Sequence, residues 1–307
     1  MGLCYYTTPY NFLQAKIKWR KDSFYVEELI NLDLVQEDGE YFLYKIYKPW
    51  GITTESFTQR LRKFGAFPLG RKDKYSKARV YIISKRRLPS MKNLCLIGKL
   101  PQDIKMDEIH IGNRFRISVY ISGVNVLKSL NDITCLIEEI NEYQGKNILN
   151  YFGYQRFGIT RRNHLIGYKI LKMHKPRTIN INQSRIYLEA LQSYLFNILL
   201  SRMALRGNLP NTLPIPGYSL EEKKLVELYG LSTLSARTIK KGLLRLRDMG
   251  LRFYGGLRDT RLTLIKPIHY DVRGKELLLD FALSRGQYAT ILLREIFKPK
   301  HPRKSGF

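Results

Sequence analysis

The sequence predicts an α+β fold, from the order of its segments and from its composition. Strand-like segments rich in aromatic and β-branched residues gather before residue 123, helical segments dominate the middle, and one strand and one helix follow near the end. The chain has 307 residues and 44% hydrophobic content, so it can bury a sizeable core. We therefore expect a folded protein with a sheet and flanking helices.

The first part of the chain reads as strands with one short helix. Four segments combine strand-forming residues with alternation or flanking turn signals: 23–30, 40–48, 78–85 and 113–122. The short helix is 56–65, for which Ser56 and Gln59 form a capping box and Gly65 stands where a C-cap belongs. In 113–122, apolar residues alternate with Arg114, Arg116, Ser118 and Tyr120, which predicts a strand with one basic face.

The remaining segments are mainly helical. Periodicity predicts helices at 132–143 and 184–206 and a basic helix at 235–249. We interpret 208–218, with three prolines and a glycine, as a boundary loop, followed by a second capping box of Ser219 and Glu222. The chain then returns to a strand at 275–284, a helix at 287–297 and a basic tail.

Charge is the strongest compositional signal. Lys and Arg number 53 against 26 Asp and Glu, a net charge of +27 that favours a polyanionic partner, with RNA or DNA first. A solvated basic surface and an anionic membrane are the alternatives. The sequence has neither a run of about 18 apolar residues nor a signal-peptide pattern, so we expect a cytoplasmic protein that does not span a membrane.

Cysteine and histidine give no sign of a metal site. Cys4, Cys95 and Cys135 form no Cys-x-x-Cys pair, and the five histidines are scattered. We therefore expect no metal and look for chemistry among the carboxylates.

The stretch GRKDKYSK, 70–77, places Asp73 among cations on a turn between a helix and a strand. Such a turn can project a side chain into a cleft, and nearby positive charge favours an ionised carboxylate. The alternative is a surface turn whose aspartate makes exposed ion pairs of little energetic value.

The stretch NYFGYQRFG, 150–158, combines aromatic, amide and guanidinium groups with two glycines. Asn150, Phe152 and Arg156 supply groups that can stack on an unpaired base or read its edge. The alternative is an aromatic loop that fills the core, with Arg156 in an internal ion pair.

Three motifs together carry a resemblance to a known family. GRKDK at 70–74, NYFGYQRFG at 150–158 and RGQYATILLREI at 285–296 occur in the order found in the TruD family of tRNA pseudouridine synthases, and the chain resembles that family over nearly its whole length. Weaker similarity lies at 18–28, 112–117 and 190–197.

The resemblance implies an enzyme that isomerises uridine to pseudouridine without any cofactor. The matching catalytic aspartate is Asp73, as nucleophile or base, with Lys18 beside it to orient the carboxylate. The implied RNA-contacting residues are Phe24, Asn150, Phe152, Tyr288, Lys72 and Arg156. Lys18 as an ordinary surface lysine and Phe24 as a core residue remain alternatives.

The implied fold is a pseudouridine synthase core with a mixed, largely antiparallel sheet. Residues 1–175 and 263–307 would form this catalytic domain, and 176–262 a short inserted helical domain. We expect a monomer that acts on tRNA, at the uridine in the thirteenth position or at an anticodon uridine of a precursor. Ser76, Ala78 and Val80 depart from the family pattern, so a catalytically weak or inactive RNA-binding relative is the alternative, and DNA binding through 235–249 is a third.

Overall fold

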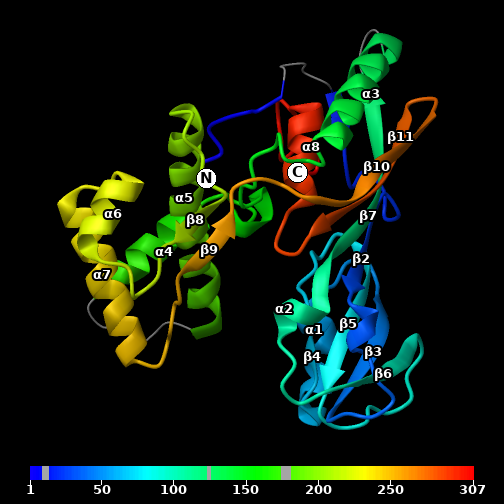
Figure 1. The fold of residues 1–307 in the computed structure, drawn as a ribbon, viewed down its shortest axis with the longest axis horizontal. Helices are drawn as coiled ribbons and strands as arrows, with labels where there is room; N and C mark the ends of the chain where they lie inside the picture. The colour runs from blue at the N-terminus through cyan, green and yellow to red at the C-terminus, as the bar shows by residue number, and fades with distance from the viewer. Residues whose placement is uncertain (9–13, 123–125, 174–180) are drawn as a thin grey trace. The chain divides into compact units, whose positions relative to one another are not determined.

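The computed structural model describes residues 1–8, 14–122, 126–173 and 181–307 (Figure 1). The chain forms two compact units. The sheet unit comprises Asn11–Gly145, Thr263–Ala289 and Ile296–Phe307, and the helical unit comprises Met1–Tyr10, Lys146–Leu262 and Thr290–Glu295.

The sheet unit is built on one nine-stranded sheet. Its strands are β1 (Gln14–Lys16), β2 (Phe24–Ile30), β3 (Tyr41–Lys48), β4 (Phe67–Pro68), β5 (Lys77–Ser84), β6 (Leu94–Leu100), β7 (His110–Ser122), β10 (Leu264–Arg273) and β11 (Glu276–Ser284). The main path runs β10-β11-β7-β2-β5-β3-β6, while β1 pairs with β7 and β4 with β5. Strands β2 and β5 are parallel and the other pairs are antiparallel. The prediction of a mixed, largely antiparallel sheet is confirmed.

Alternation along the strands separates a buried face from a polar one. In β7, Phe115, Ile117 and Val119 are buried while Arg116 is exposed, as the sequence pattern predicted. Strand β2 pairs with β7 so that Phe24 stands opposite Ile117 on the buried face. The polar face therefore carries the basic side chains.

Short helices connect the strands of this unit. They are η1 (Leu32–Leu34), α1 (Thr54–Thr58), η2 (Gln59–Phe64), α2 (Met106–Ile109) and α3 (Val126–Glu142). Helix α3 packs beside β10, as Figure 1 shows, and the Asn141 amide bonds the backbone of Ile268.

The capping box predicted at Ser56 and Gln59 is wrong. Helix α1 begins two residues earlier, and the Thr53 hydroxyl accepts the Ser56 amide hydrogen at 3.2 Å. The rest of the predicted helix is the 3-10 helix η2, and Gly65 ends it in the left-handed conformation, as expected.

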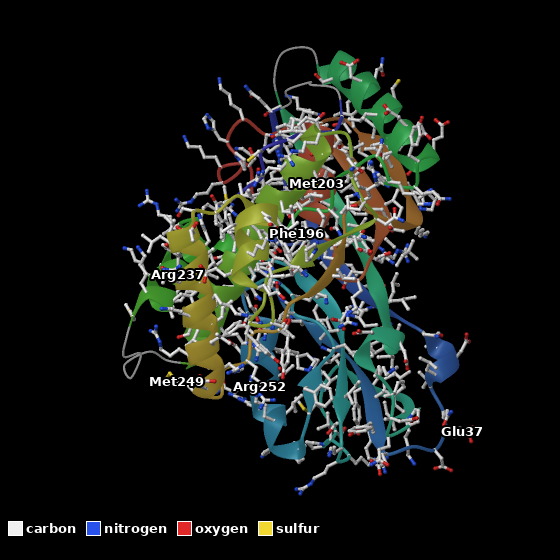
Figure 2. The ribbon with its side chains drawn as sticks, turned by 60° about the vertical axis from the view of Figure 1, so that its left-hand side comes forward. Glu37, Phe196, Met203, Arg237, Met249 and Arg252 are labelled. Carbon is white, nitrogen blue, oxygen red and sulfur yellow. The ribbon has the colours of Figure 1, made fainter. Side chains whose placement is uncertain are left out.

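The helical unit contains helices and a two-stranded ribbon. Its elements are η3 (Tyr154–Phe157), α4 (Asn163–Lys172), α5 (Ile181–Leu205), β8 (Thr212–Ile215), α6 (Glu222–Tyr229), α7 (Thr233–Asp248), β9 (Gly256–Asp259) and most of α8 (Ala289–Phe297). In Figure 2, Phe196 marks α5, and Arg237 and Met249 mark the two ends of α7.

Two details of the middle region differ from the sequence prediction. The predicted boundary loop 208–218 includes β8. The local sequence does not indicate this strand, because its partner β9 lies 41 to 47 residues further along the chain. The capping box of Ser219 and Glu222 is also wrong, since α6 follows Glu221 and has no side-chain cap bond. The division into 1–175 with 263–307 and 176–262 stays a prediction, and its first boundary lies outside the described residues.

Candidate active site

The loop that carries Asp73 joins β4 to β5 and is attached to the turn that precedes α1. The Thr54 hydroxyl accepts the Lys72 amide hydrogen at 2.9 Å, and the Gly51 amide donates to the Lys74 carbonyl at 2.8 Å. These bonds hold the backbone on either side of Asp73.

Lys48, the last residue of β3, lies at the centre of this arrangement. Its side chain is fully buried, and its ammonium donates to four backbone carbonyls, those of Pro49, Ile52, Asp73 and Ser76, at 3.1, 2.9, 3.1 and 2.6 Å. Burial lowers the pKa of Lys48 from 10.5 to about 8, while the charge of Asp73 acts in the opposite direction. One buried ammonium therefore joins the two turns.

A buried ion pair holds the loop from its other side. The Lys72 ammonium bonds Glu28 of β2, whose second carboxylate oxygen accepts the Tyr81 amide hydrogen at 2.6 Å. A side chain at Gly70 would place its Cβ 2.6 Å from the Glu28 carboxylate and 2.8 Å from the Lys72 ammonium. A side chain at Gly70 would therefore have to displace this buried ion pair.

The side chain of Asp73 remains accessible, with 39% of its surface exposed. Its carboxylate lies 3.4 Å from the Lys18 ammonium, which also sits 4.9 Å from the centre of the Phe24 ring. Lys18 has a backbone φ of 55°, a left-handed conformation that is uncommon for lysine. The structure thus brings Lys18, Phe24 and Asp73 together within the sheet unit.

Three of the four cations within four residues of Asp73 pair with other carboxylates. Arg71 pairs with Glu55 at 2.9 Å, Lys72 with Glu28, and Lys77 with Asp22. Lys72, which we expected among the RNA contacts, is largely buried in its pair. Its role in RNA binding stays a prediction. The ion pair with Glu28 attaches the loop to β2.

Asn150 and Phe152 form a second cluster, in the helical unit, around Arg258. The Arg258 guanidinium donates to the Asn150 side-chain oxygen at 2.7 Å and lies 4.1 Å from the centre of the Phe152 ring. The Asn150 amide nitrogen donates to the Asp259 carbonyl at 3.0 Å. Both predicted residues are buried and held in fixed orientations.

Arg156 lies close to the same cluster. Its guanidinium bonds Glu189 of α5 at 2.7 Å and sits 5.6 Å from the centre of the Phe152 ring. The internal ion pair considered as an alternative is therefore present, and an RNA contact by Arg156 stays a prediction.

The third motif surrounds α8. Tyr288, in the sheet unit, is half-buried one residue before the helix. Further along the motif, Arg294 and Glu295 form hydrogen bonds with the backbone of the first residues of the chain. Arg294 donates to the Tyr5 carbonyl at 3.1 Å, and Glu295 accepts the Thr8 amide hydrogen at 3.4 Å. The arginine and glutamate of this motif thus have a structural place.

The residues that depart from the family pattern occupy ordinary positions. Ala78 and Val80 are fully buried, and the buried Ser76 hydroxyl donates to the Asp73 carbonyl at 3.0 Å. Ser76 thereby adds a hydrogen bond to the loop that carries Asp73.

Sequence reasoning missed Glu28, Lys48 and Arg258. A signal was available for the first two, because each occupies a position that strand alternation assigns to the buried face. A charge there is expected to be paired or hydrogen-bonded. Nothing in the local sequence distinguishes Arg258 from other arginines.

In the described parts of the chain, no cluster of three or more histidine, cysteine or acidic residues could hold a metal ion. Over the same residues, no helix has both the length and the apolar character needed to cross a membrane.

Comparisons with known proteins agree on one family. The model of the family described as tRNA pseudouridine synthase D (TruD) matches residues 1–181 and 200–296. A relative in Pyrobaculum islandicum with the name "Probable tRNA pseudouridine synthase D" is 27% identical over 72% of each chain. The tRNA pseudouridine synthase D of Thermus thermophilus is 28% identical over 92% of this chain and 89% of the relative. A solved TruD structure from Methanosarcina mazei has the same fold, with a TM-score of 0.64, 19% identity, and coverage of 97% of this chain and 96% of the other.

The fold is that of a pseudouridine synthase, an RNA-modifying isomerase. Within that class, the chain belongs to the TruD family of tRNA pseudouridine synthases, whose model covers most of its length.

Proposed function

We propose that this protein converts a uridine of tRNA to pseudouridine with Asp73 as the catalytic carboxylate. The observation that carries the proposal is the placement of Asp73. Its carboxylate is accessible and lies beside Lys18, which contacts the Phe24 ring, and its backbone carbonyl accepts a hydrogen bond from the buried Lys48 ammonium. A reacting group needs this combination of access and fixed position.

The reaction exchanges one glycosidic bond for another. The bond between C1′ and N1 breaks, the uracil turns, C5 bonds to C1′, and the hydrogen on C5 leaves while N1 gains one. The Asp73 carboxylate acts either as a nucleophile at C1′ or as a base at C2′. Lys18 fixes the orientation of the carboxylate through its ion pair.

The remaining sequence candidates are proposed as substrate contacts. In the sheet unit, Phe24 and Tyr288 would pack against the uracil ring, and in the helical unit Asn150 and Phe152 are proposed as further RNA contacts, through hydrogen bonding and stacking. Arg156 and Lys72 would contribute positive charge near the RNA backbone. The proposed target is the uridine at the thirteenth position of tRNA, or else an anticodon uridine of a precursor.

The proposal is tested with Asp73→Asn, which keeps the side-chain shape and removes the charge. Wild type and variant are incubated with tRNA transcripts, and pseudouridine is mapped by carbodiimide treatment and primer extension. We expect product from the wild type and none from the variant. The matched control is Asp38→Asn, which changes a fully exposed carboxylate of the same unit and should leave the yield unchanged.

The target is identified with two further transcripts, in which cytidine replaces either the uridine at the thirteenth position or the anticodon uridine. The replacement that abolishes pseudouridine formation marks the target. Absence of product from the wild type on a complete tRNA pool would instead favour the RNA-binding, inactive relative. That the protein acts as a monomer in the cytoplasm stays a prediction, to be checked by sedimentation and by fractionation.

A further inference from the structure

Large aromatic side chains are exposed on the segments that carry Lys18 and Asp73 and on the turn bonded to the Asp73 loop. The chain has two tryptophans, Trp19 and Trp50, and each is 37% exposed, while Tyr75 is 48% exposed. Tryptophan is usually well buried, so two exposed rings beside a candidate active site suggest a ligand surface. We call Trp19, Trp50, Tyr75 and the half-exposed Tyr120 the aromatic platform.

The platform consists of two ring pairs in the sheet unit. Trp19 lies 5.6 Å from Tyr120, and its indole nitrogen donates to the Ser118 carbonyl at 3.2 Å, which fixes the ring. Trp50 lies 5.4 Å from Tyr75. Each pair presents an aromatic surface held by its own contacts.

Positive charge lies over the same rings. The Arg20 guanidinium is 4.5 Å from the Trp19 ring centre, the Lys21 ammonium 5.7 Å from that of Trp50, and the Lys74 ammonium 5.7 Å from that of Tyr75. Arg20, Lys21 and Lys74 are exposed, so the platform combines stacking surfaces with accessible cations.

The backbone connects the platform to the candidate catalytic residues. Trp19 follows Lys18 directly, and Tyr75 lies two residues after Asp73. The bond from the Gly51 amide to the Lys74 carbonyl joins the turn that carries Trp50 to the loop of Asp73. Because the rings and Asp73 belong to connected segments, a ligand bound to the platform would have a fixed position with respect to the Asp73 carboxylate.

We propose that the aromatic platform binds unpaired nucleotides on either side of the target uridine, with bases on the rings and phosphates on Arg20, Lys21 and Lys74. The inference rests on the proposed function and adds how the substrate is held. A uridine turned out of its stack leaves its neighbours without a stacking partner, and aromatic rings replace that partner regardless of sequence. Aromatic stacking and nearby cations together match single-stranded RNA.

The fluorescence of Trp19 and Trp50 reports directly on binding to the platform. In Asp73→Asn, binding of tRNA should quench tryptophan emission after correction for absorption by the RNA. The variant Trp19→Phe leaves Trp50 as the single emitter and should still be quenched. Unchanged emission on saturating tRNA, or quenching by anionic lipid vesicles but not by tRNA, would overturn the proposal.

Affinity gives a second, independent measure. In the Asp73→Asn background, Trp50→Ala with Tyr75→Ala should weaken tRNA binding by about tenfold or more, as expected for lost base stacking. Tyr143→Ala, a control that removes an exposed tyrosine at the end of α3, should change binding by less than about twofold. A circular dichroism spectrum and a melting curve check that each variant is folded.

Abasic nucleotides beside the target uridine identify what the rings contact. The protein with intact rings should bind the abasic tRNA more weakly, and the double alanine variant, which keeps only Trp19 and Tyr120, should lose less affinity from the abasic sites. Equal losses from the abasic sites in both proteins would contradict the proposal. Because these experiments use Asp73→Asn, they do not depend on turnover. Quenching by tRNA together with no pseudouridine product from the wild type would reject the proposed function and retain the platform.

Discussion

Replacing Lys48 with methionine removes the ammonium that joins the two turns beneath Asp73. Methionine keeps most of the length of the side chain and its apolar stem but donates no hydrogen bond. The four carbonyls of Pro49, Ile52, Asp73 and Ser76 would lose this donor in a site without water access to the Lys48 side chain. We expect lower stability and a less fixed Asp73.

The magnitude follows from two opposing terms. An ammonium has three hydrogens, and hydrogen bonds from a charged donor contribute about 1.5–3 kcal/mol each, or roughly 5–9 kcal/mol together. Burying the charge costs about 3 kcal/mol, which corresponds to the lowering of the Lys48 pKa from 10.5 to about 8. The free energy of unfolding of Lys48→Met should therefore fall by about 2–6 kcal/mol at pH 7.

Chemical denaturation at several pH values measures both terms. Between pH 8 and 10.5 the unfolded lysine holds a proton that the folded one has lost, so the Lys48 contribution to stability rises with pH. The difference between wild type and Lys48→Met should widen over that range. The control is Lys45→Met on the same strand, whose partly exposed pair with Glu27 at 3.1 Å should contribute less than about 1 kcal/mol.

Steady-state kinetics separate a loop effect from general destabilisation. If Lys48 positions Asp73, kcat should fall by more than KM changes under conditions where the variant is folded. A Lys48→Met protein within about 0.5 kcal/mol of the wild type, or one no less stable than Lys45→Met, would refute the reasoning.

Two further predictions concern packing and pH. Gly70→Ala should destabilise the protein by about 2 kcal/mol or more, because its Cβ would lie 2.6 Å from the buried Glu28 carboxylate, whereas Gly256→Ala, with open space around it, should have little effect in the same denaturation assay. His164 stacks on Tyr194 at 4.6 Å, and burial lowers its pKa to about 4. Only the unfolded state then binds this proton between pH 6.5 and 4, so stability should fall by about 3 kcal/mol over that range. His164→Phe should lack that component, and an identical pH profile would contradict the assignment.

Strand β7 and helix α5 were predicted from strong local patterns. Strand β7 alternates apolar and polar residues, α5 is a long and largely apolar stretch, and both were found. Strand β10 was missed because it lies at the edge of the sheet, where seven of its ten residues are exposed and Pro267 interrupts the run. The antiparallel hydrogen bonds with β11 stabilise β10 as a strand, although its local sequence does not indicate one.

Local sequence patterns also predicted only part of the candidate site. Lys18 and Asp73 are 55 residues apart, and family resemblance rather than local chemistry suggested that they meet. Lys48 is one of 53 basic residues, and only its position on a buried strand face marks it. Contacts between distant segments depend on tertiary pairing, which composition and periodicity do not specify.

The surroundings of Asp73 explain how a chain of charge +27 keeps one carboxylate available. Cations next to Asp73 in the sequence would compete for it if they had no other partner. Glu55, Glu28 and Asp22 bind three of the four cations within four residues of Asp73, namely Arg71, Lys72 and Lys77, and the ammonium of the fourth, Lys74, lies 5.7 Å from the centre of the Tyr75 ring. Asp73 is thus left paired with Lys18 at 3.4 Å, long for a charge-assisted hydrogen bond, and 39% of its side chain stays exposed. The acidic residues around the loop therefore favour a carboxylate that is oriented without being covered.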